Sequence, residues 1–484
     1  MKYRYPEYRT ALNKEMLEKC CDIGARIAEE TGLMVRHKTF RNAVQGREGV
    51  EIKGERVHFS QKLIKENIAR FTAKARKTLL VQKEEAFSNE WKITYGGGAS
   101  EVIDIETDEI RLATLQDLKI LIKLADSFGI EGAYPVIPQD VVPSMRAIAC
   151  FKVSCESSGK GMPGGYLDMR QARYIYEMRQ VMEKVFTVNL CVPRIMTIDE
   201  EDLKIFLEFY PLWKKDRNIK FRIQDYHMLG INTPISTTGC IAHYIAELFS
   251  VYSLFHLFDP ELDLSLSISA GQPTDLRGVC IAFGSPKMHL YSFLDSMIIP
   301  LLCGLEPENY RPTRVRLETS SCAVDEQAGM EKMASALLGA LQGARQFRYA
   351  GSLGINEIFS GVQFVIDLEI VNYIREVVES FNPHADMFVM EGIYELLEKV
   401  SLEREQFISD VDTASKLRNI IPSSNLLHRE KLRSWMSHRK TVKHRAMEIC
   451  LQRINEEGND FHLPDDKQKA LNEIYMRAEK ELLK

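Results

Sequence analysis

The sequence predicts an α/β fold, a (β/α)8 TIM barrel with helical extensions at both ends of the chain. Three observations support this prediction. Eight short β-rich runs occur between residues 91 and 400, a helical segment follows each run, and no glycine-rich phosphate loop opens the series. Strands that alternate with helices in one continuous span are typical of parallel sheets covered by helices. The alternative, an open doubly wound sheet, would need a phosphate-binding glycine turn early in the span.

The eight runs are rich in β-branched and aromatic residues, and the segments between them carry apolar residues at helical spacing. The predicted strands are residues 92–98, 130–137, 149–155, 185–191, 219–226, 263–269, 315–321 and 345–351. The predicted helices are residues 114–127, 139–147, 168–183, 199–215, 236–258, 286–303, 325–343 and 361–380.

Both ends of the chain are expected to be mainly helical. The N-terminal region reads "EYRTALNKEMLEKCCDIGARIAEETG", with apolar residues at helical spacing and a glycine stop. We expect three regions: a mainly helical region over 1–90, the barrel catalytic domain over 91–400 and a helical extension over 401–484. The extension is strongly basic, which indicates either a solvated helix face or a docking face for an acidic partner.

Composition excludes several functional classes. The net charge is 63 − 68 = −5, which argues against a general nucleic-acid binder. No stretch of 18 uncharged apolar residues predicts a membrane span, and the polar N-terminus lacks the apolar core of a secretory signal. The ten cysteines form no CxxC pair, so we expect free thiols, a cytoplasmic location and no metal site.

Active sites of such barrels are built where the strands end, and tyrosines are frequent at these positions. An aromatic ring holds a cation that has no proton to donate, such as a quaternary ammonium, and a nearby carboxylate strengthens the site. Asp225 and Glu318 are the candidate carboxylates. The alternative is that each tyrosine packs a loop root. The aromatic candidates are Tyr95, Tyr134, Tyr166, Tyr226, Tyr349 and Phe359.

Two further chemistries are weaker candidates. Asp225 and His227 lie on the same face of one strand end, where they could form an acid–base couple or simply hydrogen-bond a loop. Cys322 follows the seventh predicted strand, where a thiol nucleophile is conceivable, but no histidine is adjacent in sequence. No hydrolase, metalloprotease or cysteine-protease motif accompanies these residues. No catalytic residue is therefore assigned.

Three blocks of the chain resemble the trimethylamine:corrinoid methyltransferase family. The first is "YGGGASEVIDIETDEIRLATLQDL", the second is "DYHMLGINTPISTTGCIAHYIAELFS", and the third is "SSCAVDEQAGMEKMASALLGALQGARQFRYAGSLGINEIFSGVQFVIDLEIV". The resemblance covers roughly residues 50–390 in the family's order. It implies a (β/α)8 barrel that transfers a methyl group from an amine to the cobalt of a corrinoid, which a separate small protein carries.

The chain departs from the family pattern at two places. Trimethylamine enzymes of the family contain pyrrolysine near the seventh strand, whereas residues 320–324 here are ordinary amino acids. The resemblance is therefore to the branch without pyrrolysine, whose members act on quaternary amines such as glycine betaine, proline betaine, carnitine or γ-butyrobetaine. The segment "FISDVDTASKLRN" also lacks the His-Thr pair that the family often carries near the end of its barrel.

The chemistry of a quaternary nitrogen explains why pyrrolysine could be dispensable. The nitrogen is already cationic and its leaving group is a neutral amine, so the protein has to orient one N–CH3 bond toward Co(I). Arg194 and His227 are the candidates for binding a substrate carboxylate. A lyase that uses Asp225 and His227 and a non-catalytic betaine binder are the alternatives. A homo-oligomer built through the terminal helices is also expected.

Overall fold

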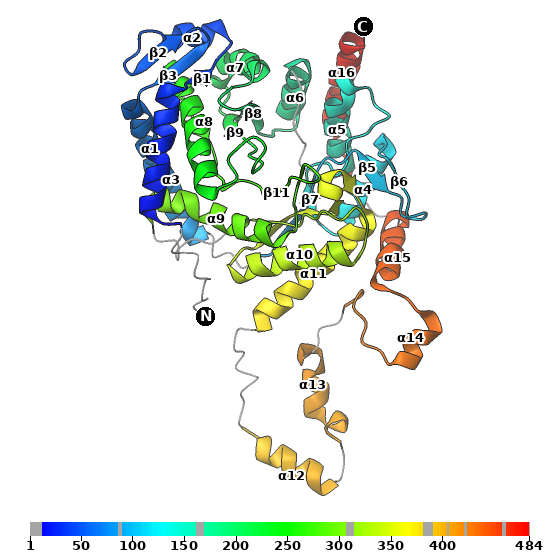
Figure 1. The fold of residues 1–484 in the computed structure, drawn as a ribbon. Helices are drawn as coiled ribbons and strands as arrows, with labels where there is room; N and C mark the ends of the chain where they lie inside the picture. Colours follow the sequence, from blue (N-terminus) through cyan, green and yellow to red (C-terminus); the bar gives the residue numbers. More distant parts are fainter. Residues whose placement is uncertain are drawn as a thin grey trace.

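The computed structural model describes residues 12–85, 90–160, 169–305, 314–380, 391–403, 406–420, 424–456 and 461–483. Strands and helices alternate through the middle of the chain, and helices predominate at both ends (Figure 1).

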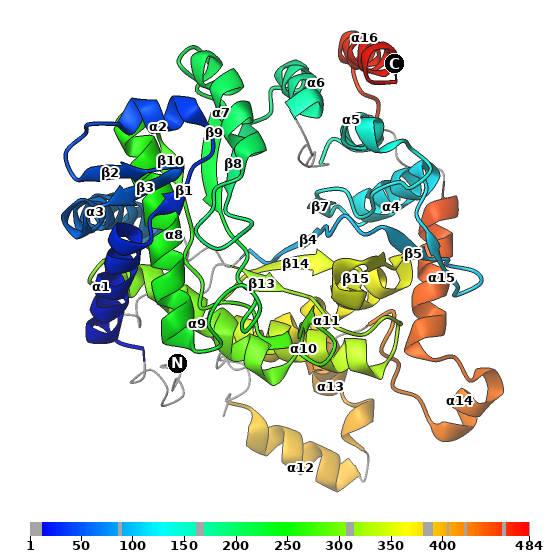
Figure 2. The ribbon, with the colours of Figure 1, turned by 45° about the horizontal axis from the view of Figure 1, so that its top comes forward.

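Two parallel sheets form the centre of the molecule. One has the order β10-β9-β8 and the other the order β13-β14-β4-β7, so neighbouring strands follow the sequence that a barrel requires. Their bounds are Phe186–Cys191 (β8), Ile219–Gln224 (β9), Leu264–Ser265 (β10), Val315–Arg316 (β13), Gln346–Ala350 (β14), Lys92–Tyr95 (β4) and Glu131–Gly132 (β7). The predicted α/β class with parallel strands is confirmed. A closed barrel is not, because the two sheets stay separate within the described residues (Figure 2).

The predicted third strand, residues 149–155, is wrong. These residues belong to helix α5, Pro143–Ser157, which begins with a proline at its first position. Proline fits there because its missing N–H would have no partner in the first turn. The run "ACFKVSC" is short and apolar, and periodicity alone does not distinguish a buried strand from a buried helix in such a run. No strand in the described part of the chain joins β7 to β8.

The predicted helix at residues 139–147 is wrong in its bounds, because α5 begins at Pro143 and continues to Ser157. The seven other predicted helices of the central region are present, and their ends agree with the prediction to within two residues. Several begin at a side chain that caps the first turn: Asp199, Ser236, Ser285 and Asp325 each accept a hydrogen bond from a backbone N–H two or three residues ahead. Their bounds are Leu115–Ser127 (α4), Met169–Val181 (α6), Glu200–Trp213 (α7), Thr237–Phe258 (α8), Pro286–Leu302 (α9), Glu326–Leu341 (α10) and Gly361–Ser380 (α11).

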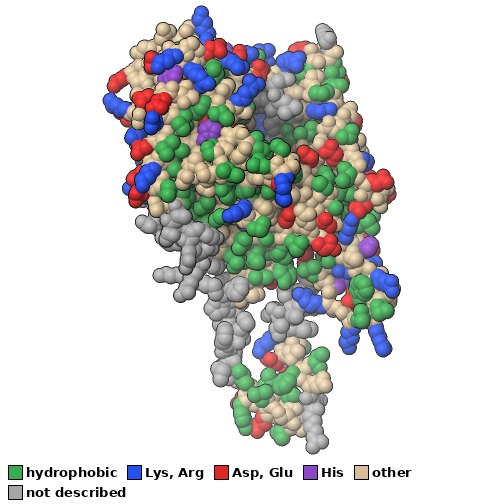
Figure 3. All heavy atoms as spheres, viewed as in Figure 1, with side chains coloured by type: hydrophobic (Ala, Val, Ile, Leu, Met, Phe, Trp, Pro, Cys, Tyr) green, Lys and Arg blue, Asp and Glu red, His purple; other side chains and the backbone are tan. Residues whose placement is uncertain are grey.

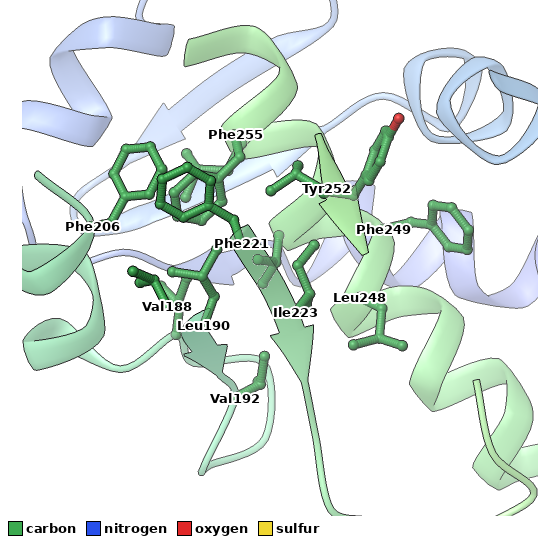
Figure 4. Close-up of a cluster of buried hydrophobic side chains, with 14 of the residues drawn as sticks. Val188, Leu190, Val192, Phe206, Phe221, Ile223, Leu248, Phe249, Tyr252 and Phe255 are labelled. Atoms are coloured by element: carbon green, nitrogen blue, oxygen red, sulfur yellow. The ribbon is translucent and has the colours of Figure 1, made fainter. Parts of the chain in front are cut away.

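Strands β8 and β9 have one apolar and one polar face. Burial alternates along both strands, and the buried side packs against α7 and α8 (Figure 4). Phe206 of α7 lies between Phe221 of β9 and Phe255 of α8, with ring centroids 4.9 and 4.7 Å apart. The opposite face faces the space between the two sheets, and its side chains are polar: Thr187, Asn189, Lys220, Arg222 and Gln224.

The N-terminal region packs directly on the central helices. Helix α1 lies along α8 (Figure 1), and the contact is close enough that a Cβ on Gly24 would lie 2.7 Å from Ile245 Cγ2. A small antiparallel sheet of order β1-β3-β2 follows α1. The bounds are Lys14–Glu30 (α1), Leu33–Met34 (β1), Lys38–Val44 (α2), Val50–Lys53 (β2), Arg56–Phe59 (β3) and Gln61–Glu85 (α3).

Short strands elsewhere form a mixed sheet of order β15-β16-β5-β6 and the hairpin β11-β12. Their bounds are Ser352–Leu353 (β15), Ile358–Phe359 (β16), Glu101–Ile103 (β5), Ile110–Leu112 (β6), Thr274–Asp275 (β11) and Cys280–Ile281 (β12), with a 3-10 turn at Gly354–Asn356.

The C-terminal region divides into two parts. Helix α15 packs against α4 and α11, and α16 packs against α5 and α6. In contrast, α12 and α13 stand away from the rest of the molecule (Figure 1). The bounds are Ile393–Glu403 (α12), Val411–Ile420 (α13), Leu432–His438 (α14), Val442–Asn455 (α15) and Asp465–Leu482 (α16), with a 3-10 turn at Phe407–Ser409.

Helix α8 is the one helix in the described ranges that is long and apolar enough to cross a membrane. Within its most apolar 18 residues, 83% are buried inside the protein. Helix α8 is therefore the core helix on which α1 and β9 pack.

Candidate functional site

The candidate site is the polar space between the two parallel sheets. Figure 3 shows the molecule hollowed between the part that carries β8 and β9 and the part that carries α5 and α16. Arg222 of β9, Arg348 of β14 and Arg314, which directly precedes β13, contribute positive charge to this interior. Burial lowers the pKa of Arg314, and the charges of Arg348 and Arg222 lower it further, so these side chains lie within electrostatic reach of one another.

An ion pair between Arg316 and Glu318 lies near the end of β13. Arg316 Nε is 2.6 Å from Glu318 Oε2, and Arg316 Nη2 donates to Glu318 Oε1 over 2.7 Å. Asn356 Nδ2 donates to the same Oε1 over 2.6 Å. Burial raises the pKa of Glu318, and Arg316 opposes that shift. The carboxylate is 4% exposed but the guanidinium side chain is 41% exposed, so Arg316 keeps a face free for an anion.

Aromatic rings surround the Arg316 guanidinium. Its carbon lies 5.0 Å from the ring centre of Tyr349 and 5.5 Å from that of Phe283. Tyr226, at the end of β9, is 59% exposed. Partial burial raises the pKa of Tyr226, and the charges of Tyr349 and Cys191 raise it further. The charge of Arg316 opposes this shift. Tyr226 and Tyr349, from opposite sheets, therefore face the same space.

The end of β14 and the loop after it have an unusual backbone. Tyr349, Ile355 and Asn356 have φ values of 68°, 61° and 69°. Side chains other than glycine rarely adopt this left-handed region, and such residues concentrate at functional sites. Here the strained backbone places Tyr349 against Arg316 and Asn356 against Glu318.

A second, more deeply buried cluster lies below Tyr226. Asp225 Oδ2 is 2.8 Å from His227 Nε2, and Glu247 Oε2 of α8 is 2.7 Å from the same nitrogen. Glu247 Oε1 is 3.1 Å from His243 Nε2. Asp225, His227 and Glu247 have side chains no more than 3% exposed. The predicted Asp225–His227 pair therefore forms, but Glu247 and His243 complete it.

The groups of this cluster strongly change one another's pKa values. Burial lowers the pKa of His227, but hydrogen bonds with Asp225, Cys240 and Glu247 outweigh it and raise the pKa to about 11. Burial raises the pKa of Asp225 to about 6, against the opposing effect of His227. Burial also opposes ionisation of Glu247, yet His227 and His243 hold its pKa well below the usual range.

The remaining predicted residues lie at several places. Tyr95 and Phe359 are buried, at 4% and 2% exposure, and pack in the core: Tyr95 against Phe364, and Phe359 under Gly351. Arg194 is exposed on the loop after β8. Tyr134 is half-buried between β7 and α5, and Cys322 is exposed on the loop before α10. Tyr166 lies outside the described residues.

Sequence reasoning missed the residues that complete both clusters. Arg316 and Glu318 are two residues apart in the predicted strand 315–321, so their shared direction could have been predicted from strand periodicity. His243 and Glu247 are four residues apart on a helix, which places them on one face. No local signal could have placed Phe283, because the loop that carries it meets β13 only through the tertiary fold.

The chain is similar in sequence to a known family of methyltransferases. A family model described as trimethylamine methyltransferase (MTTB) matches residues 2–482. The chain is 24% identical over 402 residues to the trimethylamine methyltransferase MttB of Desulfitobacterium hafniense, which covers 80% of this chain and 77% of that protein. It is 25% identical over 230 residues to MttB of Methanosarcina thermophila and 28% identical over 234 residues to MttB2 of Methanosarcina mazei.

The coverage differs among these relatives. The matches span about half of the methanogen proteins, 45% and 44% of their lengths, and about three quarters of the bacterial one. The family model extends further along the chain than the blocks that predicted the resemblance, since it reaches into the C-terminal helices. The predicted resemblance is confirmed: the chain belongs to the trimethylamine methyltransferase (MTTB) family of methyltransferases.

Proposed function

We propose that this protein transfers a methyl group from a betaine-type quaternary amine to the Co(I) corrinoid of a separate corrinoid protein. In this reaction the N–CH3 bond breaks and leaves its electron pair on nitrogen, so a neutral tertiary amine departs. The methyl group bonds to cobalt, which is formally oxidised from Co(I) to Co(III). No proton has to move, so the protein needs to bind and orient the amine rather than to supply an acid or a base.

The observation that carries the proposal is the arrangement of Tyr226, Tyr349 and Arg316 in one interior space. A betaine bears a quaternary nitrogen and a carboxylate at opposite ends. The exposed ring of Tyr226 suits the ammonium, and the half-exposed guanidinium of Arg316 suits the carboxylate. Trimethylamine has no carboxylate, so it would leave the positive interior unused. Residues 320–324 also read "SSCAV", with ordinary side chains near the position of pyrrolysine in trimethylamine enzymes.

The same geometry argues against the lyase alternative. Asp225 and His227 are both engaged by neighbours within 2.8 Å, and His227 is 1% exposed. An acid–base couple has to come within hydrogen-bond reach of its substrate. Tyr226 and Arg316 offer more accessible groups than this couple does.

The first test is an assay panel with the full-length chain. The protein is mixed with its cognate corrinoid protein, reduced to Co(I), and with one amine at a time: trimethylamine, glycine betaine, proline betaine, carnitine or γ-butyrobetaine. Absorbance reports methyl-Co(III). We expect methyl transfer from one betaine and none from trimethylamine. Transfer from trimethylamine alone would contradict the proposed substrate class, and turnover of a betaine without any corrinoid would favour the lyase.

A binding measurement tests the alternative of a non-catalytic betaine binder. If the protein binds a betaine by calorimetry but does not methylate the corrinoid protein, it is a binder that keeps the cation site without the transfer. We expect binding and transfer to select the same amine.

The expected homo-oligomer is also part of the proposal. Four large apolar side chains of the segment that stands away from the main body are strongly exposed: Tyr394 69%, Leu402 77%, Ile408 77% and Val411 78%. Apolar surface gathered in this way is typical of protein–protein contacts. We assign α12 and α13 to the contact between copies, which leaves the interior between the two sheets open to the corrinoid protein.

A further inference from the structure

The buried cluster below Tyr226 contains more hydrogen-bond acceptors than its protons can satisfy. His227 Nε2 lies between Asp225 Oδ2 at 2.8 Å and Glu247 Oε2 at 2.7 Å, yet one ring nitrogen carries one proton. Glu247 Oε1 already accepts from the backbone N–H of Met196 over 2.5 Å. Asp225 Oδ2 and His243 Nε2 are buried at ion-pair distance from His227 and Glu247, but neither atom makes a well-directed hydrogen bond among the described residues. Buried polar atoms without partners call for an explanation.

The two imidazoles point their Nε2 atoms toward the same carboxylate. The rings of His227 and His243 are parallel, with 3° between their planes and centroids 4.7 Å apart. The other ring nitrogens face protein groups: His243 Nδ1 is 3.1 Å from Thr233 Oγ1, and His227 Nδ1 is 3.9 Å from Cys240 Sγ. An outer partner on Nδ1 that leaves Nε2 free is the arrangement found around metal-bound histidines.

We propose that His227, His243 and Glu247, with Asp225 as the fourth ligand, form a binding site for a divalent transition-metal ion, Zn²⁺ being the first candidate. The ligand atoms of His227, His243 and Glu247 lie within 4.8 Å of one another. Ligand atoms at about 2.0–2.2 Å from a tetrahedral ion lie roughly 3.3–3.6 Å apart. The closest contacts of the cluster, at 2.7 and 2.8 Å, would widen slightly around the ion, and the wider ones would shorten. Two imidazoles with two carboxylates suit Zn²⁺ better than Mg²⁺ or Ca²⁺, which prefer oxygen alone.

Charge balance supports the same conclusion. Two carboxylates carry two negative charges into a buried position, and a divalent ion with two neutral imidazoles cancels both. The four ligands come from two short motifs, Asp-x-His after β9 and His-x-x-x-Glu on α8, so the ion would join the strand end to the helix. Four protein ligands make a closed, structural site. The ion would hold the loop that carries Tyr226 at the edge of the interior.

The wild-type protein provides the decisive measurement. Tag-free full-length protein is stripped with a chelator, dialysed and loaded with Zn²⁺ or Co²⁺. We expect about one Zn²⁺ per chain by mass spectrometry of the metal, and visible ligand-field bands of tetrahedral intensity with Co²⁺. Uptake well below one equivalent, or the spectrum of hydrated Co²⁺, would overturn the proposal. This readout requires no substrate and no corrinoid, so it is independent of the proposed function.

Two variants and a control locate the site. His243→Gln removes a ligand, and Glu247→Gln keeps the shape and the acceptor for the Met196 N–H. We expect each to weaken metal retention at least tenfold, while His289→Gln retains it, because His289 of α9 contacts Ser335 and lies outside the cluster. Circular dichroism checks folding of each variant. Retention of the metal at wild-type affinity by both cluster variants would contradict this assignment.

Discussion

At the scale of single residues, Arg316 shows how a strand with only two paired residues positions a charged group. Its guanidinium lies over two rings, and Glu318 binds one side of it in a two-point pair. These contacts fix the orientation of a side chain that would otherwise have several rotatable bonds. The remaining exposed face is therefore directed into the interior, where a substrate carboxylate would bind.

Replacement of this side chain tests its role directly. We expect Arg316→Gln to raise the KM for the active betaine by about 10- to 100-fold, because a hydrogen bond to a charged group contributes about 1.5–3 kcal/mol. The KM for a quaternary amine that lacks a carboxylate, such as tetramethylammonium, should stay unchanged in this variant. Steady-state kinetics of methyl transfer measure both effects.

Arg194→Gln is the matched control for this prediction. Arg194 was the arginine that sequence reasoning favoured, but it is exposed on the loop after β8. We expect its loss to change the KM by less than about twofold, in line with the small effects of exposed charges. A large effect at Arg194 and none at Arg316 would reverse the assignment.

The buried pair of Lys332 and Asp367 yields a stability prediction. Lys332 Nζ lies 2.6 Å from Asp367 Oδ2, and neither side chain is exposed. Asp367 also accepts from the Gly351 N–H and from Gln363 Nε2. Lys332→Met leaves a buried carboxylate without its cation, so we expect the free energy of unfolding to fall by about 3–5 kcal/mol. Denaturant titration followed by circular dichroism measures this loss.

The double variant Lys332→Met/Asp367→Asn separates the charge from the packing. Asparagine retains a carbonyl oxygen for the Gly351 N–H and carries no charge. We expect the double variant to be more stable than Lys332→Met alone. If the second substitution adds to the loss, the pair contributes through packing rather than through its charges.

At the scale of secondary-structure elements, the contact between α1 and α8 depends on a glycine. Gly24 has no Cβ, and one placed there would meet Ile245 Cγ2 at 2.7 Å and the Ala242 carbonyl oxygen at 2.9 Å. The two helices approach closely because that space is empty. The approach covers part of α8, most of whose residues are buried.

The same substitution, glycine to alanine, should change thermal stability in opposite directions in α1 and α10. In an exposed helix interior, Gly→Ala stabilises by about 0.5–1 kcal/mol. Gly329 of α10 has open space around its missing Cβ, so Gly329→Ala should raise the midpoint of thermal unfolding. Gly24→Ala should lower it, because the clash with Ile245 has to move one helix. Equal shifts in both variants would show that α1 adjusts without cost.

The helices and strands also show where sequence patterns are sufficient to predict secondary structure. The central helices agree with their predicted ends because capping residues such as Asp199 and Ser236 mark the first turn locally. The seven correct strand positions have β-branched residues followed by polar turns. The third strand was wrong because residues 149–155 are apolar on nearly every side, and a helix buried all round has the same composition as a buried strand.

At the scale of the whole molecule, α12 and α13 stand away from the two sheets (Figure 1). Their exposed apolar side chains are the basis for the proposed contact between copies. We expect Leu402→Glu/Ile408→Glu to lower the molar mass measured by light scattering after size-exclusion chromatography, because buried charges at an interface oppose association. Unchanged circular dichroism would show that the chain itself stays folded.

Ile110→Glu is the control for this prediction. Ile110 is 52% exposed on β6, a part of the surface to which no contact is assigned. Its substitution should leave the molar mass unchanged. If the wild-type chain is a monomer at micromolar concentration, the assignment of α12 and α13 is wrong.

The sequence by itself determined the α/β class, seven of the eight predicted strand positions, seven of the central helices and the family, because each depends on local periodicity, capping or short motifs. Only the tertiary structure decided which of these residues meet. Tyr95 and Phe359 have the same aromatic character as Tyr226 and Tyr349, yet the first two lie in the core and the last two face the interior. Glu247 joins His227 across 20 positions of sequence, and Arg316 meets Phe283 across 33. Such contacts depend on how elements pack in space, and spacing along one element does not record that packing.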